Sequence, residues 1–209
     1  MKASSRTTLG IVLFIPLAAV LLVTFACLPG PVGDPEQSKV DEQLVGAWRA
    51  EPTDPGDKSL IVALLRPWDA HTYLLQYIAV ETKEGKESHE MMPMKAWLTK
   101  IGDATFLTAQ PMDDLRYAVG DDGQKPYWVV MRLDKTPTGM NIRMVDPGSE
   151  FIKGLTKRED LEAAIKAHLN DKIYSSGDAT AFKKLGKEDK GFLEALLGKF
   201  KSSPDVHLP

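Results

Sequence analysis

Alternation of apolar and polar side chains marks two neighbouring segments in the second half of the chain. In YWVVMRLD (residues 127–134) and TGMNIRMVD (residues 138–146), apolar side chains recur at every second position. A period of two places such side chains on one face of a β-strand. The two segments therefore predict a pair of strands with one mostly apolar face and one mostly polar face.

Further apolar runs of strand length begin at residue 44. The runs at residues 94–101 and 104–110 are joined by Gly102-Asp103, a dipeptide typical of a tight hairpin turn. The short connections predict an antiparallel sheet. The predicted strands cover residues 44–51, 59–66, 72–80, 94–101, 104–110, 127–134 and 138–146.

Helical periodicity begins after residue 155. Thr156 and Glu159 have the spacing of a capping box, which satisfies the free amides at the start of a helix. A second amphipathic stretch covers residues 188–200, and residues 181–185 between the two helices predict a short last strand. Apolar residues recur at helical spacing in both stretches: Leu161, Ala164, Ile165 and Leu169, then Phe192, Leu193, Leu196, Leu197 and Phe200.

The strand predicted at residues 59–66 differs from the others, because residues 60–65 are apolar at every position. A strand that is apolar on both faces is usually covered on both. We therefore expect the C-terminal helices to pack outside this part of the sheet.

The N-terminal segment has the pattern of an export signal. Lys2 and Arg6 precede an apolar run at residues 9–26, and the only cysteine, Cys27, follows it. A basic start, an apolar centre and a small residue before the break are typical of a secretory signal. With Ala26 before Cys27, the segment resembles the signal of bacterial lipoproteins. The resemblance implies a signal peptide at residues 1–26, lipid on Cys27 and membrane anchorage in the cell envelope.

Two alternatives leave Cys27 without a special role. The apolar run is long enough to span a bilayer as an uncleaved helix, or the signal is cleaved and the protein is secreted. Because Cys27 is the only cysteine, no internal disulfide is possible, and stability must come from the apolar core.

Composition separates a tether from a single domain. Residues 27–40 follow the apolar run and are rich in Pro, Gly and charged residues, which predicts a flexible tether. The remainder, residues 41–209, predicts one β-domain with a helical tail at about 156–200. The chain has 26 basic and 29 acidic residues, and this balance argues against a nucleic-acid partner.

Gly46 and Trp48 open the first predicted strand as Gly-Ala-Trp. This Gly-x-Trp resembles the opening motif of lipocalins and lipocalin-like domains. The resemblance implies a mainly β, α+β fold: an antiparallel up-and-down barrel with the C-terminal helices packed outside. It also implies that Trp48 plugs the closed end of the barrel. In many lipocalins an arginine of a late strand stacks on this tryptophan, and Arg143 is the candidate here.

Three tryptophans are the candidates for lining the barrel end or a ligand cavity, since aromatic walls suit apolar ligands: Trp48, Trp97 and Trp128. The alternative interpretation is that they fill the core of the barrel.

One cluster, His89, Met91, Met92 and Met94, contains soft ligands that suit Cu(I). Methionines also fill gaps in cores, and this interpretation is favoured because the three lie too close in sequence to share one face. No motif predicts a catalytic set, a cofactor or another metal site.

Two functions remain. We expect non-enzymatic binding of a small apolar or amphipathic ligand in the barrel. The alternative is a filled barrel that acts as a scaffold for other envelope proteins. An enzyme built on the barrel would need polar groups that converge in the interior, and the sequence identifies none.

Overall fold

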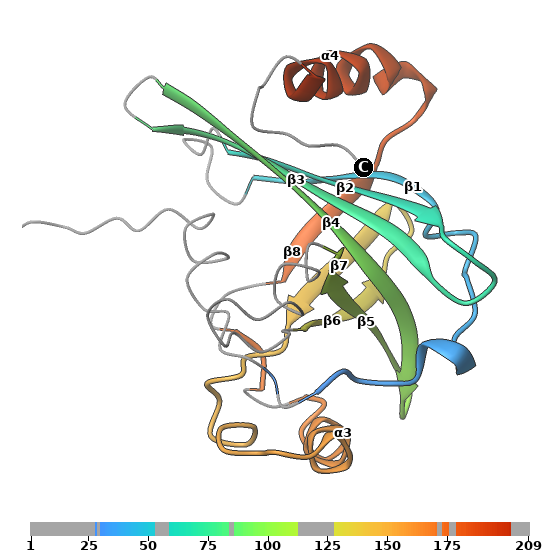
Figure 1. Ribbon diagram of the computed structural model, residues 1–209, viewed down its shortest axis with the longest axis vertical. Coiled ribbons are helices and arrows are strands. Elements are labelled where there is room, and N and C mark those ends of the chain that lie inside the picture. The colour runs from blue at the N-terminus through green and yellow to red at the C-terminus, as the bar shows by residue number, and fades with distance from the viewer. Residues whose placement is uncertain are drawn as a thin grey trace, which may run out of the picture.

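The computed structural model describes residues 28, 30–52, 59–83, 86–112, 128–170, 173–175 and 179–201. Its centre is a closed barrel of eight antiparallel strands in sequence order (Figure 1). The strands are β1 Gly46–Ala50, β2 Leu60–Pro67, β3 Tyr73–Lys83, β4 Lys86–Ile101, β5 Ala104–Pro111, β6 Val129–Lys135, β7 Gly139–Met144 and β8 Thr180–Lys184.

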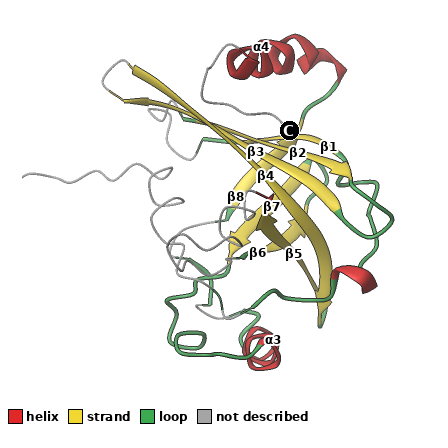
Figure 2. Ribbon diagram, viewed as in Figure 1, coloured by secondary structure: helices red, strands yellow, loops and turns green. Residues whose placement is uncertain are grey.

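Pairing of β1 with β8 closes the sheet, with Trp48 opposite Lys184. Each strand also pairs with its neighbours in sequence, which confirms the predicted antiparallel arrangement (Figure 2). The short strand predicted between the helices is β8, and the turn at Gly102-Asp103 joins β4 to β5. Strand β4 pairs with β5 only from Met94 to Ile101, so among the described strands residues 86–93 pair with β3 alone and extend beyond the barrel.

Strands β3 and β4 are longer than predicted. The sequence indicated a strand beginning at Met94, but β4 begins at Lys86 and pairs along its whole length with β3. Charged residues such as Glu87 and Glu90 obscured the signal, because the two-residue alternation of a strand is hard to recognise where both faces carry polar groups.

The two helices, α3 Arg158–Ala167 and α4 Lys190–Lys201, lie on opposite sides of the barrel (Figure 1). A short 3-10 helix, η3 Lys187–Asp189, precedes α4. The predicted capping box at Thr156 is wrong: Lys157 is the N-cap residue of α3, and no side chain caps this end.

Helix α4 packs on the outer face of β2 and β3. Leu196 and Phe200 of α4 form one cluster with Val62, Leu64 and Ile78. This packing confirms that a helix covers the run that is apolar on both faces.

The segment before β1 is packed against the barrel. Leu28 and Val32 are buried in a cluster with Phe106 of β5 and Leu161 of α3. The Val32 carbonyl accepts hydrogen bonds from Trp97 Nε1 at 2.8 Å and Thr108 Oγ1 at 2.8 Å. This arrangement differs from the flexible tether expected for residues 27–40. Pro, Gly and charge in a segment of this length are as compatible with a packed irregular path as with a tether.

Gly33 fixes the direction of this segment. Its φ is +75°, a conformation that L side chains rarely adopt, and a Cβ there would lie 1.6 Å from Thr99 Oγ1. The 3-10 helix η1 Pro35–Gln37 follows. Among the described residues, the helices are all too short or too polar to cross a membrane.

Candidate functional site: the barrel interior

Alternation along the strands divides the side chains between the inside and the outside of the barrel. On β2, Ala63 and Leu65 belong to the interior cluster, whereas Val62 and Leu64 face α4. On β5, Leu107 faces inward, whereas Phe106 faces α3. The interior is therefore almost entirely apolar, and the few polar groups that reach it are informative.

One end of the interior, where β1 begins and β8 ends, is sealed; we call it the capped end. Leu44 and Trp48 are 2% and 5% exposed, and Trp48 Nε1 donates a hydrogen bond to the Leu44 carbonyl at 2.8 Å. Tyr73 of β3 and Ala96 of β4 are fully buried beside them. The indole is therefore buried at this end, and its polar atom is satisfied.

Gly46 is required for the bend that brings Trp48 inward. Its φ is +135°, which strains any residue with a Cβ, and a Cβ here would lie 2.9 Å from Lys184 Cε. The Gly-x-Trp spacing thus has a physical basis in this chain.

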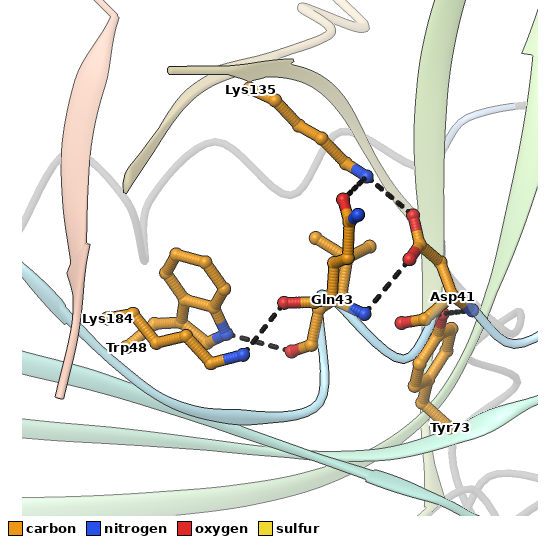
Figure 3. A network of polar contacts seen from close by, with 7 residues as sticks. Asp41, Gln43, Trp48, Tyr73, Lys135 and Lys184 are labelled. Atoms are coloured by element: carbon orange, nitrogen blue, oxygen red, sulfur yellow. Dashed lines mark hydrogen bonds and ion pairs between the residues drawn. The ribbon is translucent and has the colours of Figure 1, made fainter. Parts of the chain in front are cut away.

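A network of polar contacts lies over the cap (Figure 3). Lys135 Nζ, at the end of β6, donates hydrogen bonds to Asp41 Oδ2 at 2.6 Å and Gln43 Oε1 at 2.8 Å. Lys184 Nζ, at the end of β8, donates to the Gln43 carbonyl at 2.8 Å and lies 5.3 Å from the centroid of the Trp48 ring. The network ties the segment before β1 to the last residues of two strands.

Asp41 is the carboxylate of this network and forms an ion pair with Lys135. The hydrogen bond from Lys135 lowers the pKa of Asp41 and outweighs the opposite effect of burial. The backbone amide of Gln43 also donates to Asp41 Oδ1 at 3.0 Å, which favours the ionised carboxylate further.

The inner side chains toward the opposite end are only partly buried. Phe182 pairs with Ala50, the last residue of β1, and Met131 pairs with Met144, the last residue of β7. Five such side chains pack against the interior cluster yet keep contact with solvent: Tyr77, Met92, Met131, Ile142 and Phe182. We call them the half-buried inner set.

Two carboxylates share the inner face of β3 and β4 with this set. Glu81 follows Tyr77 at strand spacing, and Glu90 precedes Met92 in the same way. Burial, followed by the charges of Glu90 and Glu81, raises the pKa of Tyr77 to about 12, so its hydroxyl stays protonated at neutral pH. Burial, followed by the charge of Glu81, also raises the pKa of Glu90.

The other two candidate tryptophans do not meet Trp48. Trp97 is on the outer face of β4, since Ala96 and Leu98 face inward, and its indole is covered by the segment that contains Val32. Trp128 is half-buried and directly precedes β6. The three tryptophans are therefore separate, and only Trp48 closes the barrel end.

Arg143 does not stack on Trp48, which corrects the expectation drawn from the family resemblance. Its guanidinium lies 4.8 Å from the centroid of the Tyr174 ring and bonds to Asp134 Oδ2 at 2.8 Å. Position 143 faces outward, because Met140 and Ile142 face inward on β7. Lys184 supplies the cation at Trp48.

The histidine and methionine cluster is divided between two faces of β4. Met92 and Met94 belong to the interior cluster, Met91 packs under α4, and His89 contacts the Phe200 ring of α4 at 5.7 Å between centroids. Because the four side chains do not converge, this arrangement does not support a copper site. Within the described ranges, groups of three or more His, Cys, Asp or Glu side chains able to hold a metal are absent as well.

The sequence did not indicate the polar network at the cap. Asp41, Lys135 and Lys184 are ordinary surface residue types, and only barrel closure brings them together. Cys27 and the predicted signal lie outside the described residues. Comparison of the chain with family models, curated proteins and solved structures found no match.

Proposed function

We propose that this chain is an exported lipoprotein whose barrel binds a small apolar or amphipathic molecule without chemical turnover. We further assign the barrel to the lipocalin-like class. Gly46-x-Trp48, the eight-stranded meander and the closing β1–β8 pairing support that assignment.

The observation that carries the binding proposal is the half-buried inner set. Apolar side chains that face the inside of a barrel and still contact solvent can gain free energy by being covered, at roughly 25 cal/mol for each Å² removed from water. At the capped end Leu44, Trp48 and Tyr73 are already buried, so covering them offers no such gain. The ligand would therefore lie toward the end opposite Trp48.

Polar groups on the same wall favour an amphipathic ligand. The Tyr77 hydroxyl is protonated at neutral pH and stands near the carboxylates of Glu81 and Glu90. A ligand group that donates hydrogen bonds would bond to these acceptors, while its apolar part covers Met92 and Met131.

The second candidate is a scaffold with a filled barrel. The burial of Leu44, Trp48, Tyr73 and Leu107 at and near the capped end favours it, since these side chains already cover one another. This function needs a partner protein. It predicts that no ligand binds against the half-buried inner set.

Anchorage is supported by the sequence of residues 1–27. Cys27→Ser would prevent lipid attachment and signal removal, so we expect the variant to keep residues 1–26 and to lack the added mass of a lipid that the unsubstituted chain carries. An unsubstituted chain that itself keeps residues 1–26 and carries no lipid would favour an uncleaved apolar helix.

Native and denatured masses test the binding proposal directly. The chain from Leu28 to Pro209 would be exported, purified gently and weighed in both states, and any released molecule would be extracted and identified. A stoichiometric apolar molecule would support a binding barrel. A ligand-free mass, with no uptake from a lipid extract, would contradict the proposal and favour the scaffold.

A further inference from the structure

Leu28 is the first described residue and is already packed into the body of the protein. Its side chain is 2% exposed and belongs to the cluster formed by α3 and the outer face of β5. Cys27 precedes it directly. Because consecutive Cα atoms are about 3.8 Å apart, a lipid on Cys27 would leave almost no slack between membrane and domain.

The path of the segment identifies the side of the domain that lies next to the anchor. A Cβ on Gly30 would lie 3.6 Å from the Cβ of Arg158, and the Gly33 amide donates to Glu162 Oε1 at 2.9 Å. Residues 30–33 therefore follow α3 from its first turn toward its middle. Leu28 lies before Gly30, which indicates that the anchor enters near the beginning of α3.

The surface beside this entry point has a composition suited to a lipid interface. Phe151 and Leu155 are partly buried and pack against the same cluster as Leu28. Lys153 and Lys157 alternate with them and are exposed. Apolar side chains flanked by lysines, whose stems are apolar and whose charges reach water, suit the headgroup boundary of a bilayer.

Charge alone does not select this surface. Glu150, Glu159 and Asp160 are also exposed nearby, so the local balance of charge is mixed. The assignment rests on the short covalent link and on the apolar residues, and it requires no particular anionic lipid.

We propose that Phe151, Lys153, Leu155 and Lys157 form the membrane-facing surface of the domain, seated directly on the bilayer that holds the anchor. The inference rests on the proposed membrane anchor. Helix α4 lies on the opposite side of the barrel from α3 (Figure 1), so it would face away from the membrane.

Site-specific quenching tests this orientation. The full chain, produced with its own N-terminal segment in a bacterial host, would carry one added thiol at Lys157→Cys or at the matched control Lys190→Cys on α4. Each variant would be labelled with a fluorophore and placed in phosphatidylcholine vesicles that contain a headgroup-linked quencher. The chain without an added thiol reports any labelling of Cys27.

We expect several-fold stronger quenching of the label at position 157 than of the label at position 190. A flexible Gly/Ser insertion between Cys27 and Leu28 should reduce that difference, because it gives the domain slack. Equal quenching in the uninserted chain, with both variants floating with the vesicles, would overturn the proposed surface while the anchor stands. A chain that does not float would overturn the anchor and this surface together, and neither result bears on the ligand.

Discussion

The two ends of the barrel interior are built from the same strands but differ in burial. At the capped end, Trp48 and Tyr73 are buried, and a hydrogen-bonded segment with Lys135 and Lys184 lies over them. Toward the opposite end, Met131, Phe182 and their neighbours keep contact with solvent. Strand alternation makes both ends apolar, and only the segment before β1 makes one of them closed.

This difference separates stability from binding capacity. Side chains that are fully buried in the native state contribute to the free energy of folding. Side chains that are only partly buried still expose apolar surface, and a ligand that covers this surface gains free energy of binding. We therefore expect substitutions at the capped end to change the free energy of unfolding and substitutions in the half-buried inner set to change ligand uptake.

The largest effect should come from removing the segment before Asp41. A chain that starts at Asp41 loses the burial of Leu28 and Val32 and the carbonyl that accepts from Trp97 and Thr108. We expect a loss of more than about 5 kcal/mol relative to a chain that starts at Leu28, because two buried apolar side chains and two hydrogen bonds are lost together. Urea unfolding of the two chains measures it. Equal midpoints would show that the segment is dispensable and the cap independent of it.

Trp48→Ala should cost about 3–5 kcal/mol, because it opens a cavity at the capped end. The matched change, Met131→Ala, removes a half-buried side chain and should cost no more than about 2 kcal/mol. Chemical denaturation compares them. Equal losses in the free energy of unfolding would show that the two ends of the interior do not differ in burial.

Added volume should distinguish the two ends in the opposite way. Ala96→Leu overpacks a fully buried position and should cost about 1–3 kcal/mol, whereas Met131→Trp should fold with little loss. In ligand uptake the order should reverse, with Met131→Trp impaired and Ala96→Leu near normal. Thermal unfolding and uptake of a fluorescent fatty alcohol check both statements. An unimpaired Met131→Trp would exclude this wall from the binding site.

The ion pair at the cap should produce a modest acid sensitivity. Since the folded pKa of Asp41 is lowered, its contribution is present above the unfolded pKa and is lost as pH falls through the folded pKa. Lys135→Met should cost less than about 1 kcal/mol near neutral pH, because the pair is partly exposed. The cost should disappear at a pH of about 2. A cost that persists in acid would point to packing of the lysine stem instead.

The smallest effect should come from the half of the barrel opposite Trp48. Burial and the charge of Glu81 raise the folded pKa of Glu90, so its charged form opposes folding, and stability rises as pH falls through that pKa. Glu90→Gln should stabilise the protein at neutral pH by less than about 1 kcal/mol. The gain should shrink as pH falls to about 4. Differential scanning calorimetry at several pH values measures this difference. A lower stability of Glu90→Gln at neutral pH would show instead that Glu90 makes a stabilising contact.

Local pattern was sufficient to predict most of the barrel. Alternation located β6 and β7, and the apolar run at residues 60–65 required the cover that α4 provides. These features depend on neighbours along one strand or one helix, which a single sequence records.

Features that depend on closure could not be predicted. Trp97 was a candidate for the interior, and only the register of β4 turns it outward, to the Val32 carbonyl. Arg143 was expected to lie over Trp48, but barrel closure places Lys184 there instead. The segment at residues 28–40 resembles a tether in composition, and its burial depends on partners that are far away in sequence.

Binding of a fluorescent fatty alcohol, whose hydroxyl can donate a hydrogen bond, to three proteins tests the central claim most directly: the Leu28–Pro209 chain, its Met131→Trp variant and its Ala96→Leu variant. We predict saturable binding at one site per chain for the first and the third, and strongly weakened binding for Met131→Trp. Absence of binding to all three, with native circular dichroism retained, would contradict a ligand-binding barrel and leave the filled scaffold as the better account.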